Sequence, residues 1–250
     1  MTGTKRMALL IGLCSAALLL ACCGAGGAQT KGRAMESSGE QADTAAGGTG
    51  PTAAEVIASD KTIPEKLSQL KEINGDVYAW LEIPGTDISF PVLQSAEDTA
   101  FYLGHNEDKE QDDGGSIYTE YENSKDFTDY NTVIYGRNVD SRFGRLHQYQ
   151  DRDFFDEYRR LLIYLPERTL EYRIFAAYDY DDRHLLAAFD FSDTTVYSNY
   201  LEDVFAIRRI DAFIDADTEV TAQDKILTLS TGVTGQDERR YLVQAVLEEQ

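Results

Sequence analysis

Residues 226–235 read ILTLSTGVTG, a run of β-favouring residues that ends in a glycine and a turn. The run predicts a strand whose last residue, Gly232, has no side chain. Because side chains alternate along a strand, Ser230 should share a face with Gly232, and Thr231 should point the other way. Ser230 would lie about 6.6 Å before Gly232, which is two rises of about 3.3 Å. Any chemistry at this strand end therefore depends on residues supplied by other segments.

Short runs of the same kind recur through much of the chain, which has 250 residues with 15 Tyr and 11 Phe. Each run is bounded by Gly, Asn, Asp or Pro, residues that favour turns. The runs are VYAWLEIPGTDISFPVLQ, which Pro84-Gly85 divides in two, and SIYTEY, NTVIYGR, LLIYLP, LEYRIFAAYDY, KILTLST and RRYLVQAVL. Seven or eight strands at this spacing predict a mainly β fold that closes into a barrel.

Two segments have the periodicity of helices. Residues 53–75 carry apolar side chains at helical spacing, which predicts one or two helices before the first strand. After FDFSD, Ser192 or Asp193 could cap a helix that ends near Arg208-Arg209, just before the last two strands. The predicted barrel is therefore preceded by helices and interrupted by one.

The first residues are typical of an exported protein. Lys5 and Arg6 precede an apolar run, residues 8–20, that is too short for a membrane-spanning helix of about 20 residues. Residues 1–21 are therefore predicted to be a signal peptide. The run ends in LLAC, which resembles a bacterial lipobox and makes Cys22 the expected lipid attachment site. An ordinary secretory signal with incidental cysteines is the alternative.

Residues 22–52 are rich in Gly, Ala, Ser and Thr and predict a flexible tether, followed by a folded domain over residues 53–250. Together with a lipid at the amino terminus, this organisation predicts a protein anchored to the outer face of the bacterial cytoplasmic membrane. The three cysteines all precede residue 24, so the predicted domain offers no disulfide, thiolate metal ligand or cysteine nucleophile.

The charge of the chain is strongly acidic, with 23 basic and 44 acidic residues and a net charge of −21. Removal of Lys5 and Arg6 with the signal peptide would make it −23. A protein this acidic is not expected to hold nucleic acid, because binding to phosphates requires clustered positive charge.

Several separate segments together resemble class B sortases, the envelope cysteine transpeptidases that attach proteins to peptidoglycan. The resemblance covers roughly residues 63–250. The matching motifs are NGDVYAWLEIPGTDISFPVLQ, FYLGHN, GGSIYTEY, NTVIYGRN, FGRLHQY and ILTLSTG, with RRYLV at the start of the last strand. Six motifs in the order and at the spacing of the family imply a barrel of the sortase type.

The resemblance also implies where the family's chemistry would occur. Sortases use a cysteine at the end of the TLSTC strand, a histidine in YGHN, and an arginine that opens the next strand. In this chain Gly232 stands at the cysteine position and Arg137 at the histidine position. Arg240 matches the arginine, with Arg239 as the alternative register.

These two replacements remove the family's nucleophile and its proton carrier. Gly232 has no reactive atom, and Arg137 stays protonated because its pKa exceeds about 12. Ser230 is the remaining hydroxyl on the right face, but a hydroxyl needs an adjacent base to attack. The sequence therefore indicates a sortase-like protein without transpeptidase activity, and the alternative is an active sortase that uses displaced residues such as Ser230.

The same positions suggest a binding site instead. If the fold is kept, Arg137 and Arg240 flank an open space above Gly232, and paired guanidinium groups bind carboxylate or phosphate oxygens bidentately. The expected ligand is therefore a sorting-motif peptide or a cell-wall carboxylate, bound with Ser230 nearby. No cofactor is expected.

The remaining polar motifs have plainer interpretations. His105 and His147 are expected to be hydrogen-bonded near the surface or barrel rim, and His184 is expected to be solvated in a loop. The acidic runs at 107–113 and 179–182 lack the Asp-x-Asp-x-Asp-Gly pattern of a calcium loop, so no metal site is predicted.

Overall fold

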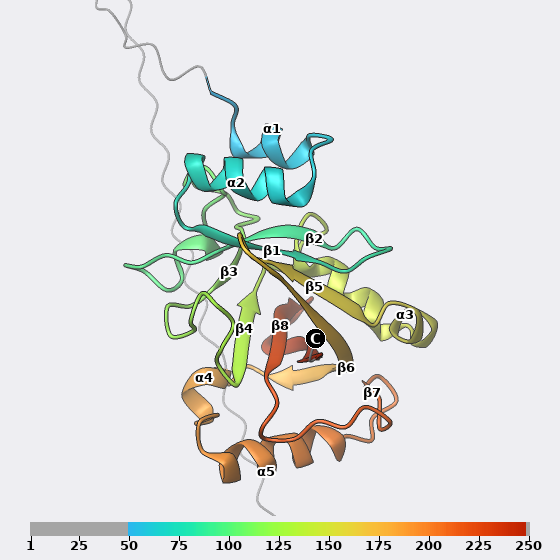
Figure 1. The fold of residues 1–250 in the computed structure, drawn as a ribbon. Helices are drawn as coiled ribbons and strands as arrows, with labels where there is room; N and C mark the ends of the chain where they lie inside the picture. The colour runs from blue at the N-terminus through green and yellow to red at the C-terminus, as the bar shows by residue number, and fades with distance from the viewer. Residues whose placement is uncertain (1–49, 249–250) are drawn as a thin grey trace, which may run out of the picture. The chain divides into compact units, whose positions relative to one another are not determined.

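The sheet of the computed structural model, which describes residues 50–248, closes on itself (Figure 1). Its nine strands are ordered β5-β1-β2-β3-β4-β8-β9-β6-β7, and a further pairing of β5 with β6 closes a barrel of eight strands, with β7 added at β6. The predicted closed barrel is confirmed. The strands are β1 (Val77–Glu82), β2 (Ser89–Leu93), β3 (Ile117–Thr119), β4 (Asn131–Tyr135), β5 (Arg160–Tyr164), β6 (Thr169–Asp181), β7 (Phe213–Ile214), β8 (Ile226–Val233) and β9 (Gln236–Leu247).

The predicted helices are also confirmed. α1 (Ala53–Ala58) and α2 (Ile63–Ile73) precede β1, and each begins with a capping box in which a threonine and a glutamate satisfy exposed backbone N–H groups. α5 (Thr194–Phe205) lies before β8, and its cap is Asp193, which accepts hydrogen bonds from the backbone N–H groups of Thr195 and Val196. In Figure 1 the α1–α2 pair and α5 lie at opposite ends of the barrel.

Three clusters of buried side chains hold these elements together. The largest fills the barrel and includes Phe143, Tyr149 and Tyr241. A second lies between α5 and the outer face of the barrel, and a third lies between α1, α2 and strands β1 to β3. Because burial of apolar area is the main favourable term in folding, the stability of the domain comes from these three layers.

Several elements were not predicted from the sequence. The 3₁₀ helix η2 (Phe143–Gln150) and α3 (Arg152–Glu157) lie between β4 and β5, and α4 (Leu185–Ala188) follows β6. The other unpredicted elements are the 3₁₀ helix η1 (Phe101–Leu103) and the two-residue strand β7. α3, α4 and η1 each span less than two turns, β7 has two residues, and η2 is a 3₁₀ helix, whose period of three residues differs from the 3.6-residue pattern of an α-helix.

The amino-terminal predictions fall largely outside the described residues. The signal peptide, Cys22 and most of the tether belong to residues 1–49. Over residues 50–248, no helix combines the length and apolar character needed to cross a membrane.

Candidate functional site

A groove of about 350 Å³ lies on the outside of the barrel where β4 and β8 end. Its floor comes from strands β3, β4, β8 and β9, and its walls come from the segments that follow β4 and β6. The lining contains all four residues that the sequence singled out. The full set is Leu103, Tyr118, Tyr135, Gly136, Arg137, Asn138, Tyr180, Asp182, Arg183, His184, Leu185, Ser230, Thr231, Gly232, Arg240 and Leu242.

Strand register places Arg240 opposite Gly232. The two residues are direct partners across the antiparallel β8–β9 pair, and Arg240 in turn pairs with Tyr180 on β6. Residues that are direct partners share a face of the sheet. Gly232, Arg240 and Tyr180 therefore form one row across the groove floor.

The alternation expected around Gly232 is visible in the neighbouring pairs. Ser230 pairs with Leu242, which belongs to the cluster outside the barrel, whereas Thr231 pairs with Tyr241, which belongs to the cluster inside it. Thr231 is 2% exposed, and its hydroxyl has no hydrogen-bond partner within residues 50–248. Its hydroxyl therefore does not serve the groove.

Position 232 is open. A Cβ atom on Gly232 would have Asn138 Cβ at 3.9 Å as its nearest neighbour, an ordinary van der Waals contact, and the backbone there is not in the left-handed region. Any amino acid could adopt this conformation. The glycine is therefore not required by packing or by backbone geometry.

The glycine before Arg137 is different. A Cβ atom on Gly136 would lie 2.5 Å from Ile117 Cδ1 and 2.7 Å from the ring of Phe143, both of which are buried. The Gly136 N–H donates to the carbonyl of Ser230 at 3.1 Å. The end of β4 is thus held tightly against β8, and this contact fixes the position of the Arg137 backbone.

Arg137 and Arg240, two of the three arginines that line the groove, keep donors free of contacts within residues 50–248. Arg137 is exposed and donates from Nε to the Leu103 carbonyl at 2.6 Å. Arg240 is half-buried and donates from Nη1 to the carbonyls of Asp237 and Arg239 at 2.8 and 2.9 Å. Neither forms an ion pair with a carboxylate of the described chain. Two uncompensated cations therefore line the groove of an acidic protein.

Arg239, the alternative register, lies elsewhere. Its direct partner on β6 is Asp181, and its guanidinium approaches Asp179 Oδ2 at 3.7 Å. Arg239 does not line the groove. Of the two arginines, Arg240 therefore shares the groove with Gly232.

Ser230 lies at the groove floor but is not activated. It is 5% exposed, and its direct partner on β4 is Tyr135. Its hydroxyl makes no hydrogen bond to any residue of the 50–248 segment. No base is therefore in contact with this hydroxyl.

His184 is exposed outside the helices and strands, as expected, but it is also held by two contacts within the domain. Its Nε2 lies 2.6 Å from Glu120 Oε2, and its Nδ1 accepts a hydrogen bond from the Ala187 N–H, which makes it the cap of α4. Because Nδ1 accepts, the neutral ring carries its proton on Nε2 and donates it to the carboxylate. Both nitrogens are occupied, although the side chain is still 44% exposed.

Glu120 is the buried partner in this contact. It also accepts a hydrogen bond from the Tyr135 hydroxyl at 3.2 Å. Burial raises the pKa of the Glu120 carboxyl, and the nearby His184 opposes that rise. Glu120 does not itself line the groove but contacts two lining residues, Tyr135 and His184, while burial raises the pKa of a third lining residue, Tyr118, to about 12.

The other two histidines are hydrogen-bonded, as the sequence suggested. His147 Nε2 lies 3.0 Å from the Gly232 carbonyl, to which it donates, and its ring stacks on Tyr241 at 4.9 Å. His105 Nδ1 donates to the Phe101 carbonyl at 2.8 Å, and the two rings stack at 3.9 Å. Neither ring lines the groove.

The acidic runs are engaged in contacts within the domain. Glu107 is buried and pairs with Arg142 at 3.2 Å, while Asp179 pairs with Arg209 at 3.3 Å. Burial raises the pKa of Glu107 despite the Arg142 cation. In the part of the chain that the structure describes, no group of three or more His, Cys, Asp or Glu side chains could hold a metal ion.

Sequence reasoning missed the wall that follows β6. Asp182, Arg183 and His184 all line the groove, and the Arg183 guanidinium lies 5.3 Å from the centre of the Tyr180 ring. The only sequence signal was a cluster of charged residues at the end of a long strand. Glu120, the partner of His184, is 64 residues away in the sequence, so the local sequence could not reveal this contact.

Comparisons with known proteins agree with this geometry. No family model matches the chain. Sortase B of Listeria monocytogenes is 33% identical over 189 residues, which cover 74% of this chain and 75% of that protein.

Solved structures give the same relationship. A mutant form of Clostridium perfringens sortase B has a TM-score of 0.66 and 30% identity, and the match covers 74% of this chain and 87% of that one. A Staphylococcus aureus sortase B–substrate complex has a TM-score of 0.64 and 25% identity, over 76% of this chain and 87% of that one. The barrel, the helix before its last two strands and the similarity over most of both chains lead to one conclusion: this chain belongs to the sortase B family.

Proposed function

We propose that this protein is a sortase B family member without transpeptidase activity, and that its groove binds the carboxylate of a peptide or cell-wall component. The observation that carries the proposal is the row of Gly232 and Arg240 with Arg137 at the groove wall. A thiolate and an imidazole would be needed there for cysteine acyl transfer. The groove instead offers Arg137 and Arg240, which form no ion pair within residues 50–248, and an open space above Gly232.

The arginines suit an anionic ligand. Arg137 has both Nη groups free, and Arg240 has Nε and Nη2 free, among contacts within residues 50–248. A guanidinium presents its donors in a fork that matches the two oxygens of a carboxylate. Because neither cation is neutralised by a carboxylate of the described chain, a bound carboxylate would gain both interactions without displacing a salt bridge.

The rest of the groove suits a peptide. Tyr118, Tyr135 and Tyr180 supply aromatic surface, and Leu103 and Leu242 supply apolar surface. Pockets with apolar walls and a few placed polar groups are typical of ligand sites. A Staphylococcus aureus relative has been solved as a complex with its substrate, which supports peptide binding on this fold.

The alternative, acyl transfer through Ser230, has less support. The Ser230 hydroxyl has no base in contact, and the one histidine of the groove wall, His184, has both ring nitrogens engaged by Glu120 and Ala187. An alcohol without a base is a weak nucleophile. A covalent adduct that forms on the unmodified protein and is lost in Ser230→Ala would favour this alternative.

We further propose that the protein acts outside the cytoplasmic membrane. The supporting features are the signal-like residues 1–21, Cys22 in its lipobox-like setting, and the polar tether up to residue 52. Metabolic labelling with a radioactive fatty acid should mark the full-length protein in cells, and Cys22→Ala should abolish the label. Labelling that persists in Cys22→Ala would overturn lipid attachment at this residue.

Calorimetry with two matched peptides tests the groove. The first is a tetrapeptide that ends in threonine with a free carboxylate, and the second is its C-terminal amide. We expect the carboxylate form to bind at least tenfold more tightly, because hydrogen bonds to charged groups contribute about 1.5–3 kcal/mol and 1.4 kcal/mol is tenfold.

Substitutions complete the test. Arg137→Ala and Arg240→Ala should each weaken carboxylate binding about tenfold or more, whereas Arg173→Ala, an exposed arginine on β6 outside the groove, should not. The unmodified protein should not cleave a sorting-motif peptide. Equal binding of acid and amide, unchanged by both groove substitutions, would reject the proposal.

A further inference from the structure

Another hollow, of about 630 Å³, lies where the segment after α5 runs into β7, and it shares no lining residue with the groove. Both elements lie at the end of the barrel away from α1 and α2 (Figure 1). Its lining consists of six apolar residues between positions 205 and 216 and of three arginines, Arg152, Arg208 and Arg209. No carboxylate of residues 50–248 lines this α5–β7 hollow, although the chain as a whole is strongly acidic.

One residue of the lining, Ile210, is 98% exposed. It lies in a turn that is closed by a hydrogen bond from the Ala212 N–H to the Arg209 carbonyl at 3.3 Å. The Arg209 guanidinium holds this turn to the barrel, because it donates to Asp211 at 2.8 Å and to Asp179 of β6 at 3.3 Å. A fixed turn therefore holds an isoleucine side chain in water, and its burial against a partner would be favourable.

The apolar residues beside Ile210 make the hollow a counterpart to this projecting side chain. Phe205, Ile207 and Ile214 pack against the cluster under α5, yet each is only partly buried. An apolar surface of several neighbouring residues on a folded domain marks a contact site. A two-fold interface requires a surface that fits a copy of itself, and a projecting side chain next to an apolar hollow meets that requirement.

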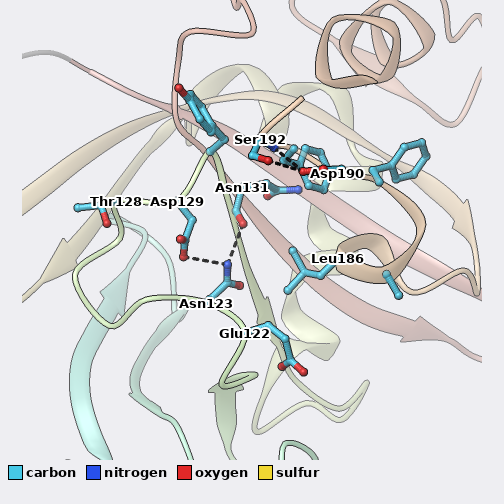
Figure 2. Close-up of a pocket in the computed structure, with 12 residues that line it drawn as sticks. Glu122, Asn123, Thr128, Asp129, Asn131, Leu186, Asp190 and Ser192 are labelled. Atoms are coloured by element: carbon cyan, nitrogen blue, oxygen red, sulfur yellow. Dashed lines mark hydrogen bonds between the residues drawn. The ribbon is translucent and has the colours of Figure 1, made fainter. Parts of the chain in front are cut away.

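Charge also favours this surface as the place where two copies meet. Because the chain has a net charge of −21, two copies repel each other over most of their surface. Figure 2 shows a cavity just before α5 begins, and its lining includes the carboxylates of Glu122, Asp129 and Asp190. The α5–β7 hollow has arginines in their place, so two acidic chains meet there with less repulsion.

Arg208 is the arginine of the hollow that has donors to spare. Its Nη1 donates to the carbonyls of Phe205 and Ile207 at 2.6 and 2.8 Å, and it forms no ion pair within residues 50–248. Two exposed carboxylates that also form none there are close in sequence, Glu202 one helical turn before Phe205 and Asp217 just after the last lining residue. The same face therefore carries a cation and carboxylates that a second copy could pair.

An anionic lipid surface fits the hollow less well. Arg152 and Arg209 already pair with Asp156 and Asp211 at 2.7 and 2.8 Å, which leaves one arginine of the three for phosphates. Attraction to anionic lipid requires several clustered basic residues. The ion pairs thus favour a second copy of the chain as the occupant.

From these contacts we propose that the α5–β7 hollow is the interface of a homodimer with two-fold symmetry, in which Ile210 of each copy enters the hollow of the other. Arg208 of each copy then lies close to the exposed carboxylates of the other. The interface shares no lining residue with the groove, so the dimer is independent of what the groove binds.

Sedimentation equilibrium of the chain from residue 22 onward, made without a lipid, tests the proposal. A reducing buffer keeps Cys22 and Cys23 from linking two chains. We expect a monomer–dimer equilibrium that Ile210→Ser weakens at least about tenfold, because each dimer buries two of these side chains. Ile73→Ser, the same substitution at an exposed isoleucine of α2, should leave the equilibrium unchanged.

A charge variant and a lipid control complete the test. Arg208→Ala should weaken the dimer about two- to tenfold, because two exposed ion pairs would be lost. Ile210→Ser should keep the melting temperature of the unmodified protein, since Ile210 is exposed. A chain that remains monomeric at about 1 mM, or a dimer that Ile210→Ser does not weaken, would overturn the proposal. A monomer that binds vesicles of phosphatidylglycerol and phosphatidylcholine, and loses this binding in Ile210→Ser, would overturn it in favour of a lipid surface.

Discussion

Installing a cysteine at position 232 should be tolerated by the fold. Gly232 has open space in front of its Cα, a non-positive φ and only Asn138 Cβ at 3.9 Å from a new Cβ atom. Glycine inside a strand is less stable than alanine by about 0.5–1 kcal/mol, because it loses more conformational entropy on folding. Gly232→Cys should therefore unfold in urea at the same concentration as the unmodified protein or a slightly higher one.

The new thiol should have a lowered pKa. Residues paired across two strands have Cβ atoms about 5 Å apart, so we take about 6 Å between the sulfur and the Arg240 guanidinium. In an effective dielectric of about 40, between surface and bulk values, this attraction is about 1.4 kcal/mol, or about one pKa unit. The thiol should thus titrate near about 7.5 instead of about 8.5, and lower still if Arg137 contributes.

The pH dependence of alkylation by iodoacetamide measures this pKa directly. Adding Arg240→Ala to Gly232→Cys should raise the thiol pKa by about one unit. A matched control is Ser230→Cys, whose sulfur would lie on the same face but opposite Leu242 instead of an arginine. A cysteine at 232 that titrates near about 8.5, and does not respond to Arg240→Ala, would refute the placement of these two residues across the groove floor.

A second substitution, Arg137→His, should supply the missing proton carrier. A positioned general acid or base contributes about 10²–10⁴ in rate. Gly232→Cys alone should form an acyl adduct with a sorting-motif peptide slowly, and Gly232→Cys with Arg137→His should turn over at least a hundredfold faster. Mass spectrometry of the intact protein detects the adduct, and chromatography of the peptide measures turnover. Absence of both from the double variant would mean that the groove no longer presents a peptide carbonyl to position 232.

Three further predictions concern stability. Burial raises the pKa of Glu120 in the folded state, so its protonation should stabilise the protein as the pH falls through that raised value towards its ordinary pKa of 4.5. Urea unfolding from pH 7 to 4.5 should show this gain relative to Glu120→Gln, and identical pH profiles would contradict it. Asp193→Ala removes the carboxylate that accepts hydrogen bonds from two backbone N–H groups at the start of α5. It should lower the free energy of unfolding by about 1 kcal/mol, measured by thermal unfolding, and Asp153→Ala on α3 is an exposed comparison. Gly136→Ala should cost about 1–3 kcal/mol and weaken groove binding, because its Cβ would overlap Ile117, and a wild-type melting temperature would contradict this.

Local pattern was sufficient to predict most of the barrel. The strand predicted to end at Gly232 is β8, which ends at Val233, and Asp193, one of the two predicted caps, begins the helix α5. The four-residue helix α4 and the two-residue strand β7 are too short for a periodic pattern to be detected. The spacing of apolar residues therefore predicts the long helices and strands, because one side of each is buried over its whole length.

Contacts between distant residues could not be predicted in the same way. His184 was expected in solvent because charged residues surround it in sequence, yet Glu120 reaches it from a strand end 64 residues away. The hydrogen bond from the Thr228 hydroxyl to Asn131 Oδ1 likewise joins residues 97 positions apart, and Gln244 donates to the same hydroxyl. Such contacts arise from the register of neighbouring strands, which the sequence of one strand does not contain.

The groove places the residues at positions 137 and 232 outside the packed core. A Cβ atom at position 232 would have Asn138 Cβ as its nearest neighbour at 3.9 Å, and Arg137 is exposed and donates to the Leu103 carbonyl, so neither position supports a buried layer. The geometry of the site is set instead by Gly136 against Phe143 and by the β4–β8–β9 ladder, all of which belong to the core. Surface substitutions away from packed features usually change stability by no more than about 0.5 kcal/mol. Substitutions at positions 137 and 232 are therefore expected to change the chemistry of the groove with little effect on stability, because the barrel holds positions 137, 232 and 240 in place.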